Sequence, residues 1–166
     1  EFGGGDVQRY RDIGAGVRTL HESLWRHAAL GPARVHALLR GEASEEEEPV
    51  SYGRLRDEAA AVAGGLRERG VSRGDTVALM LPTGFDFLRA FQGILVAGAI
   101  PVPIYPPVRL DRLEEYALRQ GGILADAGVT ALLTIARARP IASLLRARVP
   151  SLRHVVTCDE LEAAGE

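Results

Sequence analysis

The sequence predicts an α/β fold, in which repeated βαβ units build a mostly parallel sheet flanked by helices. Three observations support this prediction. Short apolar runs of strand length alternate with longer segments whose apolar residues recur at helical spacing. Glycines stand where these helical segments should end. The composition, with 46% hydrophobic and 25% charged residues over 166 positions, is that of an ordinary globular domain and not of a disordered chain.

The first predicted elements precede the clearest βαβ unit. Residues 1–17 indicate a linker or a cloning remnant, because the chain opens without Met and continues into three glycines. Residues 19–30 predict a helix, and residues 34–39 predict an edge strand. The loop over residues 41–49 contains four consecutive glutamates, Glu45 to Glu48. Their mutual repulsion favours an exposed hairpin tip over a metal site.

A helix, a strand and a second helix follow in close succession. Ser51 is the predicted cap of a helix that runs to Arg69. Residues 76–81 form an apolar run that suits a strand buried on both faces. Thr83 and the aspartate three residues later have the form of a capping box, which predicts that Thr83 caps the next helix. That helix is apolar over much of its surface and is expected to end at Gly98.

The remaining elements continue the same alternation. Pro101 and Pro103 restrict their strand to a sheet edge or a strand start. A second capping-box pattern begins at Thr157. The predicted strands cover residues 100–105, 129–135 and 153–157, and the predicted helices cover residues 110–127 and 140–147. The buried stripe of the helix over 110–127 is predicted to consist of Leu113, Tyr116, Ala117, Ile123 and Leu124.

Lysine is absent, since all 20 basic residues of the Lys and Arg class are arginine. The chain therefore contains no phosphate-loop lysine, no Schiff-base lysine and no lysine general base. No GxSxG nucleophile elbow is present either. Gly14 and Gly16 resemble the start of a dinucleotide-binding loop, but no strand precedes them and the third glycine is missing.

The histidines and the cysteine form no convincing catalytic or metal-binding pattern. His21 and His27 are six residues apart on a helix and face different directions, which does not suit a zinc pair. His154 and Cys158 are separated by a strand end and a helix cap, so a thiolate–imidazole pair is not favoured. Glu114 and its neighbour Glu115 point apart on a helix, so they are not a catalytic carboxylate pair.

The charge and the cysteine usage give expectations about partners and compartment. A net charge of −2 does not favour nucleic acid or an anionic membrane. The arginines between Arg137 and Arg153 are expected to form the solvated face of a helix and not a phosphate-binding patch. A single cysteine suits a reducing cytoplasm, and no secretory signal or spanning segment is evident. A soluble, cytoplasmic protein is expected.

A longer pattern runs from residue 50 to residue 107 and reads VSYGRLRDEAAAVAGGLRERGVSRGDTVALMLPTGFDFLRAFQGILVAGAIPVPIYPP. This layout resembles the start of the acyl-activating, adenylate-forming enzymes. Its ending PVPIYPP, with the following RLDRLEEYALRQGGILADAGVTALLT, is most similar to the fatty acyl-AMP ligase branch. The resemblance implies that residues 18–166 are part of the AMP-binding N-terminal domain, namely its first βαβ subdomain.

The resemblance also implies a reaction, though not its catalytic residues. Such enzymes use ATP and Mg²⁺ to convert a fatty acid to an acyl-adenylate, and the ligases pass the acyl group to an acyl carrier protein. The family's phosphate loop, its acidic ligands for magnesium and ribose, and its catalytic lysine come later in the family's order. No catalytic, cofactor-binding or metal-binding residue is therefore assigned, and these 166 residues are expected to be inactive as a fragment.

Two turns are the candidate substrate-binding residues. Ligands in parallel sheets bind beyond the carboxyl ends of the strands, and the resemblance places the acyl tunnel near the same loops. The candidates are Pro82, Thr83, Gly84, Tyr105, Pro106 and Pro107. Free amides beside Thr83 and Gly84 could bind an anion, but a plain capped helix is the favoured interpretation.

Other functions remain open at this point. An acyl-CoA synthetase shares the same fold, and a non-catalytic α/β binding module could share the same layout. An exposed sheet edge would also allow a homodimer. The resemblance leaves the length of the acyl chain undetermined.

Overall fold

The computed structural model describes residues 16–40, 47–107 and 112–162. The chain divides into two compact units, Glu1–Asp57 and Glu58–Glu166. Helix α3 (Tyr52–Glu68) begins in the first unit and continues into the second. Over the described residues, the predicted helices and strands are found with end positions that differ by a few residues, and strand β2 (Glu47–Ser51) is an element that the sequence did not predict.

The first unit combines one helix with a hairpin. Helix α2 (Leu20–Leu30) begins at a capping box in which Thr19 and Glu22 bond reciprocally to the backbone. Strands β1 (Val35–Arg40) and β2 (Glu47–Ser51) pair in antiparallel orientation. The predicted hairpin is therefore confirmed.

The acidic run of the hairpin is placed differently from the prediction. Glu47 and Glu48 belong to β2 and not to the hairpin tip, whereas Glu45 and Glu46 lie outside the described residues. Glu47 accepts a hydrogen bond from Arg40 across the hairpin at 2.8 Å. Glu48 accepts one from Arg54 at 2.6 Å. Arginine partners on neighbouring elements offset the repulsion that was expected to keep these two glutamates in a loop.

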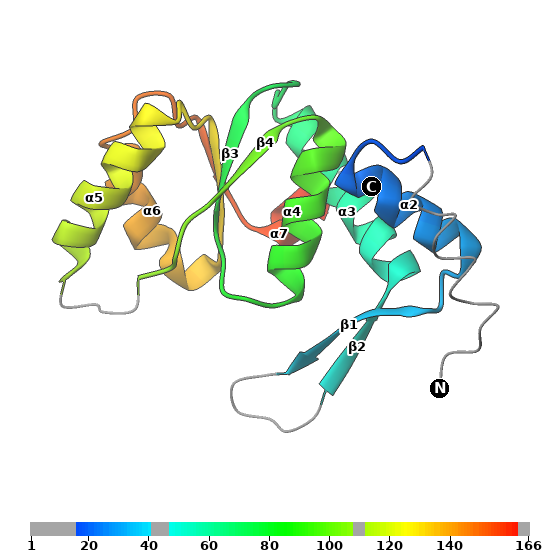
Figure 1. The fold of residues 1–166 in the computed structure, drawn as a ribbon. Helices are drawn as coiled ribbons and strands as arrows, with labels where there is room; N and C mark the ends of the chain where they lie inside the picture. The colour runs from blue at the N-terminus through cyan, green and yellow to red at the C-terminus, as the bar shows by residue number, and fades with distance from the viewer. Residues whose placement is uncertain (1–15, 41–46, 108–111, 163–166) are drawn as a thin grey trace. The chain divides into compact units, whose positions relative to one another are not determined.

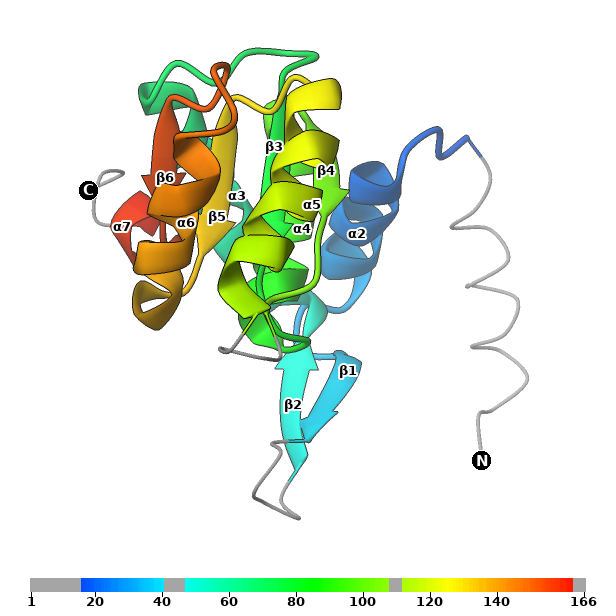
Figure 2. The same ribbon diagram turned by 90° about the vertical axis from the view of Figure 1, so that its left-hand side faces the viewer.

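The second unit is built on a four-stranded parallel sheet (Figures 1 and 2). The strands lie in the order β4-β3-β5-β6, and every neighbouring pair is parallel. The strands are β3 (Thr76–Met80), β4 (Ile100–Pro103), β5 (Ala131–Thr134) and β6 (His154–Val156). The predicted α/β fold is confirmed, and the proline-containing strand β4 lies at an edge of the sheet as the sequence predicts.

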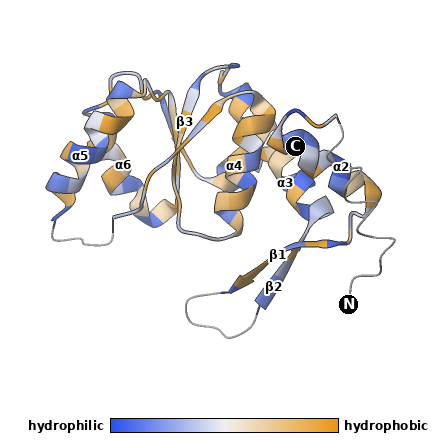
Figure 3. Ribbon diagram, viewed as in Figure 1, coloured by the Kyte–Doolittle hydropathy of each residue, from blue (hydrophilic) through white to orange (hydrophobic). Residues whose placement is uncertain are grey.

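Helices cover both faces of this sheet. On one face lie α3, α4 (Phe85–Ala97) and α7 (Cys158–Glu162), and on the other lie α5 (Leu113–Asp126) and α6 (Arg139–Arg146), which follows a short 3₁₀ turn. Strand β3 shows why both faces are closed. Its Val77 and Leu79 pack into the first core, while Ala78 and Met80 pack into the second. Helix α4 is apolar over much of its surface, in keeping with its predicted burial (Figure 3).

The ends of the helices agree with the glycine and cap predictions at several positions. Gly70, Gly98 and Gly128 adopt left-handed φ angles of 79°, 82° and 62°, at the end of α3, α4 and α5. The Ser51 hydroxyl accepts from the Arg54 amide at 3.2 Å, as expected of a helix cap. Thr157 forms reciprocal bonds with Glu160, which confirms the second capping box.

The predicted cap at Thr83 is wrong. Gly84 is the residue that precedes α4, and it provides no side-chain cap. The carboxylate of Asp86, which a capping box would direct to the backbone, instead accepts from the Arg89 guanidinium at 2.8 Å. The Asp86 carboxylate therefore pairs with Arg89 and does not bond to the backbone as the predicted capping box requires.

One member of the predicted stripe on α5 is also misplaced. Ile123 is 45% exposed, so it does not belong to the buried stripe. Gly121 is buried in its place and continues the spacing of Ala117 and Leu124. A residue two positions from Gly121 points to the opposite side of a helix, and its apolar side chain therefore faces solvent.

Candidate functional site

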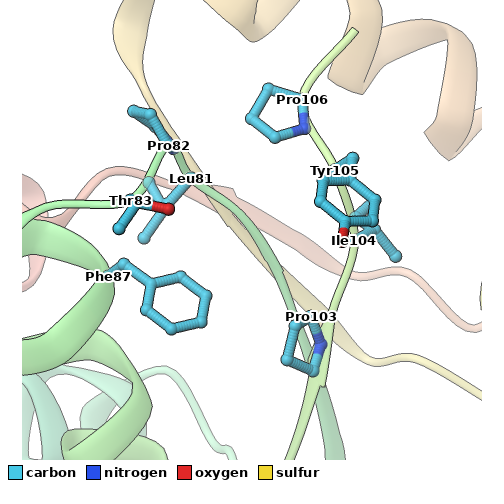
Figure 4. Close-up of a pocket in the computed structure, with 8 residues that line it drawn as sticks. All are labelled: Leu81, Pro82, Thr83, Phe87, Pro103, Ile104, Tyr105 and Pro106. Atoms are coloured by element: carbon cyan, nitrogen blue, oxygen red, sulfur yellow. The ribbon is translucent and has the colours of Figure 1, made fainter. Parts of the chain in front are cut away.

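A pocket lies where β3 and β4 end at their carboxyl termini. Its volume is about 360 Å³. It is lined by Leu81, Pro82, Thr83, Phe87, Pro103, Ile104, Tyr105 and Pro106 (Figure 4). This is the edge at which parallel sheets generally bind ligands.

The pocket has two walls of different origin. One wall consists of the turn after β3 and Phe87, which comes from the first turn of α4. The other wall is the end of β4 and the segment that follows it, from Pro103 to Pro106. Figure 4 shows the Phe87 ring and the Thr83 hydroxyl directed into the space between the walls. Apart from this hydroxyl and the phenolic hydroxyl of Tyr105, the side chains that line the pocket are apolar.

The structure brings four of the six candidate substrate-binding residues together. Pro82 and Thr83 lie on the first wall, and Tyr105 and Pro106 lie on the second. Gly84 instead precedes α4, and neither it nor Pro107 lines the pocket. The role of all six in substrate binding stays a prediction.

Sequence reasoning missed four of the pocket residues, namely Leu81, Phe87, Pro103 and Ile104. The apolar surface of its helix predicts that Phe87 is largely buried, and its ring does pack against the core, 6.1 Å from the ring of Phe91. An aromatic residue in the first turn of a helix that follows a strand is a signal that could have indicated the pocket. Pro103 could have been recognised as the last residue before the exit from β4.

Tyr116 of α5 lies close to the wall after β4 and to the end of β3. Its hydroxyl donates to the carbonyl oxygen of Tyr105 at 2.5 Å and lies 3.3 Å from Sδ of Met80. Burial raises the pKa of Tyr116 to about 12, because the ionised phenolate would lose hydration. The hydroxyl therefore keeps its proton at neutral pH. On the next strand, Thr134 donates from Oγ1 to the Met80 carbonyl at 3.4 Å.

A charged cluster lies on the face of the sheet that carries α3, α4 and α7. The buried Arg89 guanidinium, with 7% exposure for the residue, binds carboxylates from all three helices. Its contacts are Glu58 at 2.8 Å, Asp86 at 2.8 Å and Asp159 at 3.0 Å. Such a cluster fixes the positions of the helices, and its three carboxylates more than neutralise the single buried cation.

Cys158 does not have the character of a nucleophile. It is buried, and desolvation raises the pKa of its thiol to about 12 even though Arg89 acts in the opposite direction. Its Sγ lies 3.8 Å from the carbonyl oxygen of Asp86 on α4. The unfavoured pairing of Cys158 with His154 gains no support from this geometry.

The other polar groups that the sequence singled out agree with structural roles. In the described ranges, no three His, Cys, Asp or Glu side chains are grouped so that they could hold a metal ion. The ring of His27 stacks on Tyr52 with centroids 4.7 Å apart, and burial together with the nearby Arg34 lowers its pKa. Arg137, Arg146 and Arg148 are exposed, as expected of a solvated helix face. Across the described residues, no helix is long and apolar enough to cross a bilayer.

Comparison with known proteins identifies the family. The sequence profile of the AMP-binding enzymes matches residues 24–166. The chain belongs to the AMP-binding enzyme family. The predicted resemblance to adenylate-forming enzymes is thereby confirmed.

Relatives within this family have several activities. The pyochelin synthetase PchE of Pseudomonas aeruginosa is 40% identical over 106 residues, which cover 62% of this chain and 7% of the relative. An acetyl-coenzyme A synthetase of Pseudoalteromonas translucida is 29% identical over 136 residues, covering 79% of this chain and 21% of the enzyme. The chain thus spans only a small part of the curated relatives it matches.

Solved structures of the same family share the fold. A structure from work on the fatty acyl-adenylate ligases of E. coli and L. pneumophila is 27% identical and has a TM-score of 0.66, covering 72% of this chain and 21% of that chain. The L. pneumophila ligase in complex with acyl adenylate and pyrophosphate has a TM-score of 0.75 at 24% identity. That match covers 95% of this chain and 25% of the ligase.

Proposed function

We propose that this chain provides part of the acid-binding site of a ligase that converts a fatty acid to an acyl-adenylate with ATP. In the proposed reaction, the acyl group then passes to the thiol of a carrier protein. The observation that supports this most directly is the pocket between the turn after β3 and the segment after β4. Family membership supports the adenylate-forming chemistry, and the likeness to fatty acyl-AMP ligases supports the class of acid and the carrier.

The lining of the pocket suits an aliphatic chain. Leu81, Ile104 and Phe87 offer apolar surface from both walls. Removing a methylene group from water contributes about 0.8 kcal/mol, so each carbon of an acyl chain that enters strengthens binding by about fourfold. With a volume of about 360 Å³, the pocket has room for several methylene groups.

ATP and Mg²⁺ supply the adenylation chemistry in this proposal. Among the described residues no three potential metal ligands are grouped, and the 166 residues contain no lysine. Residues outside these 166 would bind both in a longer polypeptide. We therefore expect this chain alone to show no ATP–pyrophosphate exchange at any fatty acid concentration. Exchange by the purified chain would show that it contains a complete catalytic site.

The acid-binding role can be tested on the chain itself by calorimetric titration with straight-chain acids of increasing length. Affinity should rise with each added carbon and then level off once the pocket is filled. Tyr105→Glu places a carboxylate at a pocket position that is 85% exposed, so the variant should fold and yet bind at least about tenfold more weakly. The matched control is Leu118→Glu, at an exposed position on α5 that does not line the pocket.

Two results would contradict the acid-binding role. One is a wild-type affinity that does not depend on chain length. The other is equal weakening by Tyr105→Glu and Leu118→Glu, because this would show a general effect of added negative charge. A circular dichroism spectrum of each variant verifies that the fold is retained.

An acyl-CoA synthetase is the second candidate function. The acetyl-coenzyme A synthetase relative supports it, since that match extends over 79% of the chain. In a longer polypeptide that carries these residues, incubation with ATP, a fatty acid and CoA separates the two candidates. A fatty acyl-AMP ligase should form little CoA thioester and should acylate a carrier protein, whereas a synthetase should form the thioester readily.

A further inference from the structure

We infer that Tyr116 is a positioning residue that sets the width of the pocket by holding the wall after β4 next to the end of β3, where the other wall begins. This role rests on the proposed function, because it assigns Tyr116 to the same acid-binding pocket. Tyr116 does not line the pocket, and its effect on a bound acid is therefore exerted through the walls.

The geometry places one hydroxyl between the wall after β4 and the last residue of β3. The Tyr116 hydroxyl donates to the Tyr105 carbonyl at 2.5 Å, and Tyr105 belongs to the wall that follows β4. The same oxygen lies 3.3 Å from Sδ of Met80, the last residue of β3, after which the other wall begins at Leu81. A hydroxyl has one proton, and the carbonyl is the stronger acceptor, so the sulfur contact is mainly one of packing.

The wall after β4 forms few other hydrogen bonds to the sheet. The last bond of this strand to β3 runs from the Ile104 amide to the Leu79 carbonyl at 2.9 Å. Pro106 and Pro107 follow, and proline has no N–H with which to extend the pairing. Beyond the last hydrogen bond to the sheet, this wall is therefore held by the bond from the Tyr116 hydroxyl of α5 to the Tyr105 carbonyl.

Loss of the Tyr116 hydroxyl should widen the pocket and leave the fold intact. The ring of Tyr116 packs against the core between the sheet and α5, and phenylalanine keeps this packing. Without the bond to the Tyr105 carbonyl, the segment from Pro103 to Pro106 can move away from Thr83 and Phe87. A wider pocket should bind a straight chain less tightly and should discriminate less against a branched one.

Calorimetric titration of Tyr116→Phe and the wild-type chain with a straight-chain acid and a methyl-branched acid of equal carbon number tests this role. We expect the straight-chain acid to bind about five- to tenfold more weakly to the variant, with little change for the branched acid. The control Tyr52→Phe removes a phenolic hydroxyl in the other compact unit and should leave both affinities unchanged. A purely structural defect would weaken both acids together.

Amide hydrogen exchange gives a readout that does not depend on a ligand. The Ile104 amide should exchange faster in Tyr116→Phe than in the wild type, while the Arg153 amide, bonded to Thr130 beside β6, should be unchanged. If the wild type binds the acids and Tyr116→Phe retains the wild-type selectivity, the positioning role is wrong and the proposed function stands. If the wild type binds neither acid, the proposed function and the role of Tyr116 in selectivity are both wrong.

Discussion

The two faces of the parallel sheet are covered by helices that are attached in different ways. On the face with α3, α4 and α7, helix backbones approach closely at glycines, and a buried arginine connects all three helices. On the face with α5 and α6, apolar side chains fill the space, and Tyr116 and Thr134 provide hydroxyl bonds to the pocket wall and to β3. Backbone contacts leave little room for adjustment, whereas side-chain contacts allow some.

Glycines mark the closest approaches on the first face. A Cβ at Gly65 of α3 would lie 2.3 Å from the Leu161 carbonyl oxygen of α7. A Cβ at Gly93 of α4 would lie 2.5 Å from Cγ1 of Val62 on α3. Real Cβ atoms do not approach so closely, and the helices would have to separate. The difference between the faces suggests that the first is the rigid support and that the second adjusts the pocket through α5.

Truncating adjacent core leucines of β5 compares the two faces directly and should have the largest effect. Leu132 faces the core with α5 and α6, Leu133 faces the core with α3 and α4, and both are fully buried. Each change to alanine should cost about 2–5 kcal/mol. Leu133→Ala should cost more, because helices in backbone contact cannot close the cavity. Urea unfolding measures both, and a greater loss for Leu132→Ala would contradict the proposed difference.

Adding a methyl group to α3 tests the backbone contact. Gly65→Ala should destabilise the protein by about 2–3 kcal/mol, since the opposing group is a carbonyl that cannot rotate away. Gly64→Ala is the matched control, because no atom lies within 4 Å of its added Cβ. The control should be stabilising by up to about 1 kcal/mol through helix propensity. Equal melting temperatures for the two variants would show that α7 separates from α3 without cost.

Removing the buried guanidinium tests the ionic part of the same face. Arg89→Met should cost about 1–2 kcal/mol, less than the loss of one partner from a fully buried pair, because Asp86 and Asp159 can be hydrated at the surface. Arg112→Met removes an exposed pair, with Glu115 at 3.6 Å, and should change stability by less than about 0.5 kcal/mol. Thermal unfolding distinguishes the two, and similar shifts would mean that Arg89 contributes no more than a surface charge.

The smallest effect is expected on α5. Gly121→Ala places a methyl group 3.1 Å from Cβ of Arg148, whose long side chain can move aside, so the steric cost should largely cancel the gain in helix propensity. Gly122→Ala meets open space and should stabilise by about 0.5–1 kcal/mol. Urea midpoints measure the difference. A loss of 2 kcal/mol or more at Gly121 would show that this face is as rigid as the other.

The sequence was sufficient to predict most of the fold for a clear physical reason. A strand buried on both faces is a continuous apolar run, and a helix on such a sheet has a stripe of apolar residues and a terminal glycine. Each element can therefore be recognised from its own residues. The cap at Thr83 could not be predicted correctly, because the Asp86 carboxylate can bond either to the helix backbone or to Arg89. It bonds to Arg89, whose position depends on tertiary packing.

The candidate site was predictable only in part, for a related reason. The turns that follow two neighbouring parallel strands meet at one sheet edge, which is why Thr83 and Tyr105 could be placed together before the structure was known. The position of Phe87 in the first turn of α4 indicates that it lies near this edge, but the direction of its ring depends on the angle at which α4 begins. Tyr116 was predicted as a buried residue of its helix stripe, but the partner of its hydroxyl is set by tertiary contact.

The two prolines of β4 also affect how copies of this chain can associate. The amide of Ile104 donates inward to Leu79 of β3, and that of Ile100 donates inward to Asp75, the residue before β3. The alternate positions, Pro101 and Pro103, are therefore those whose amides would face outward along the open edge. Because proline has no N–H, a strand from a neighbouring molecule would find carbonyl acceptors along β4 but no amide donors at Pro101 and Pro103. Strand addition past β4 is therefore disfavoured, which protects the pocket-bearing edge from intermolecular aggregation.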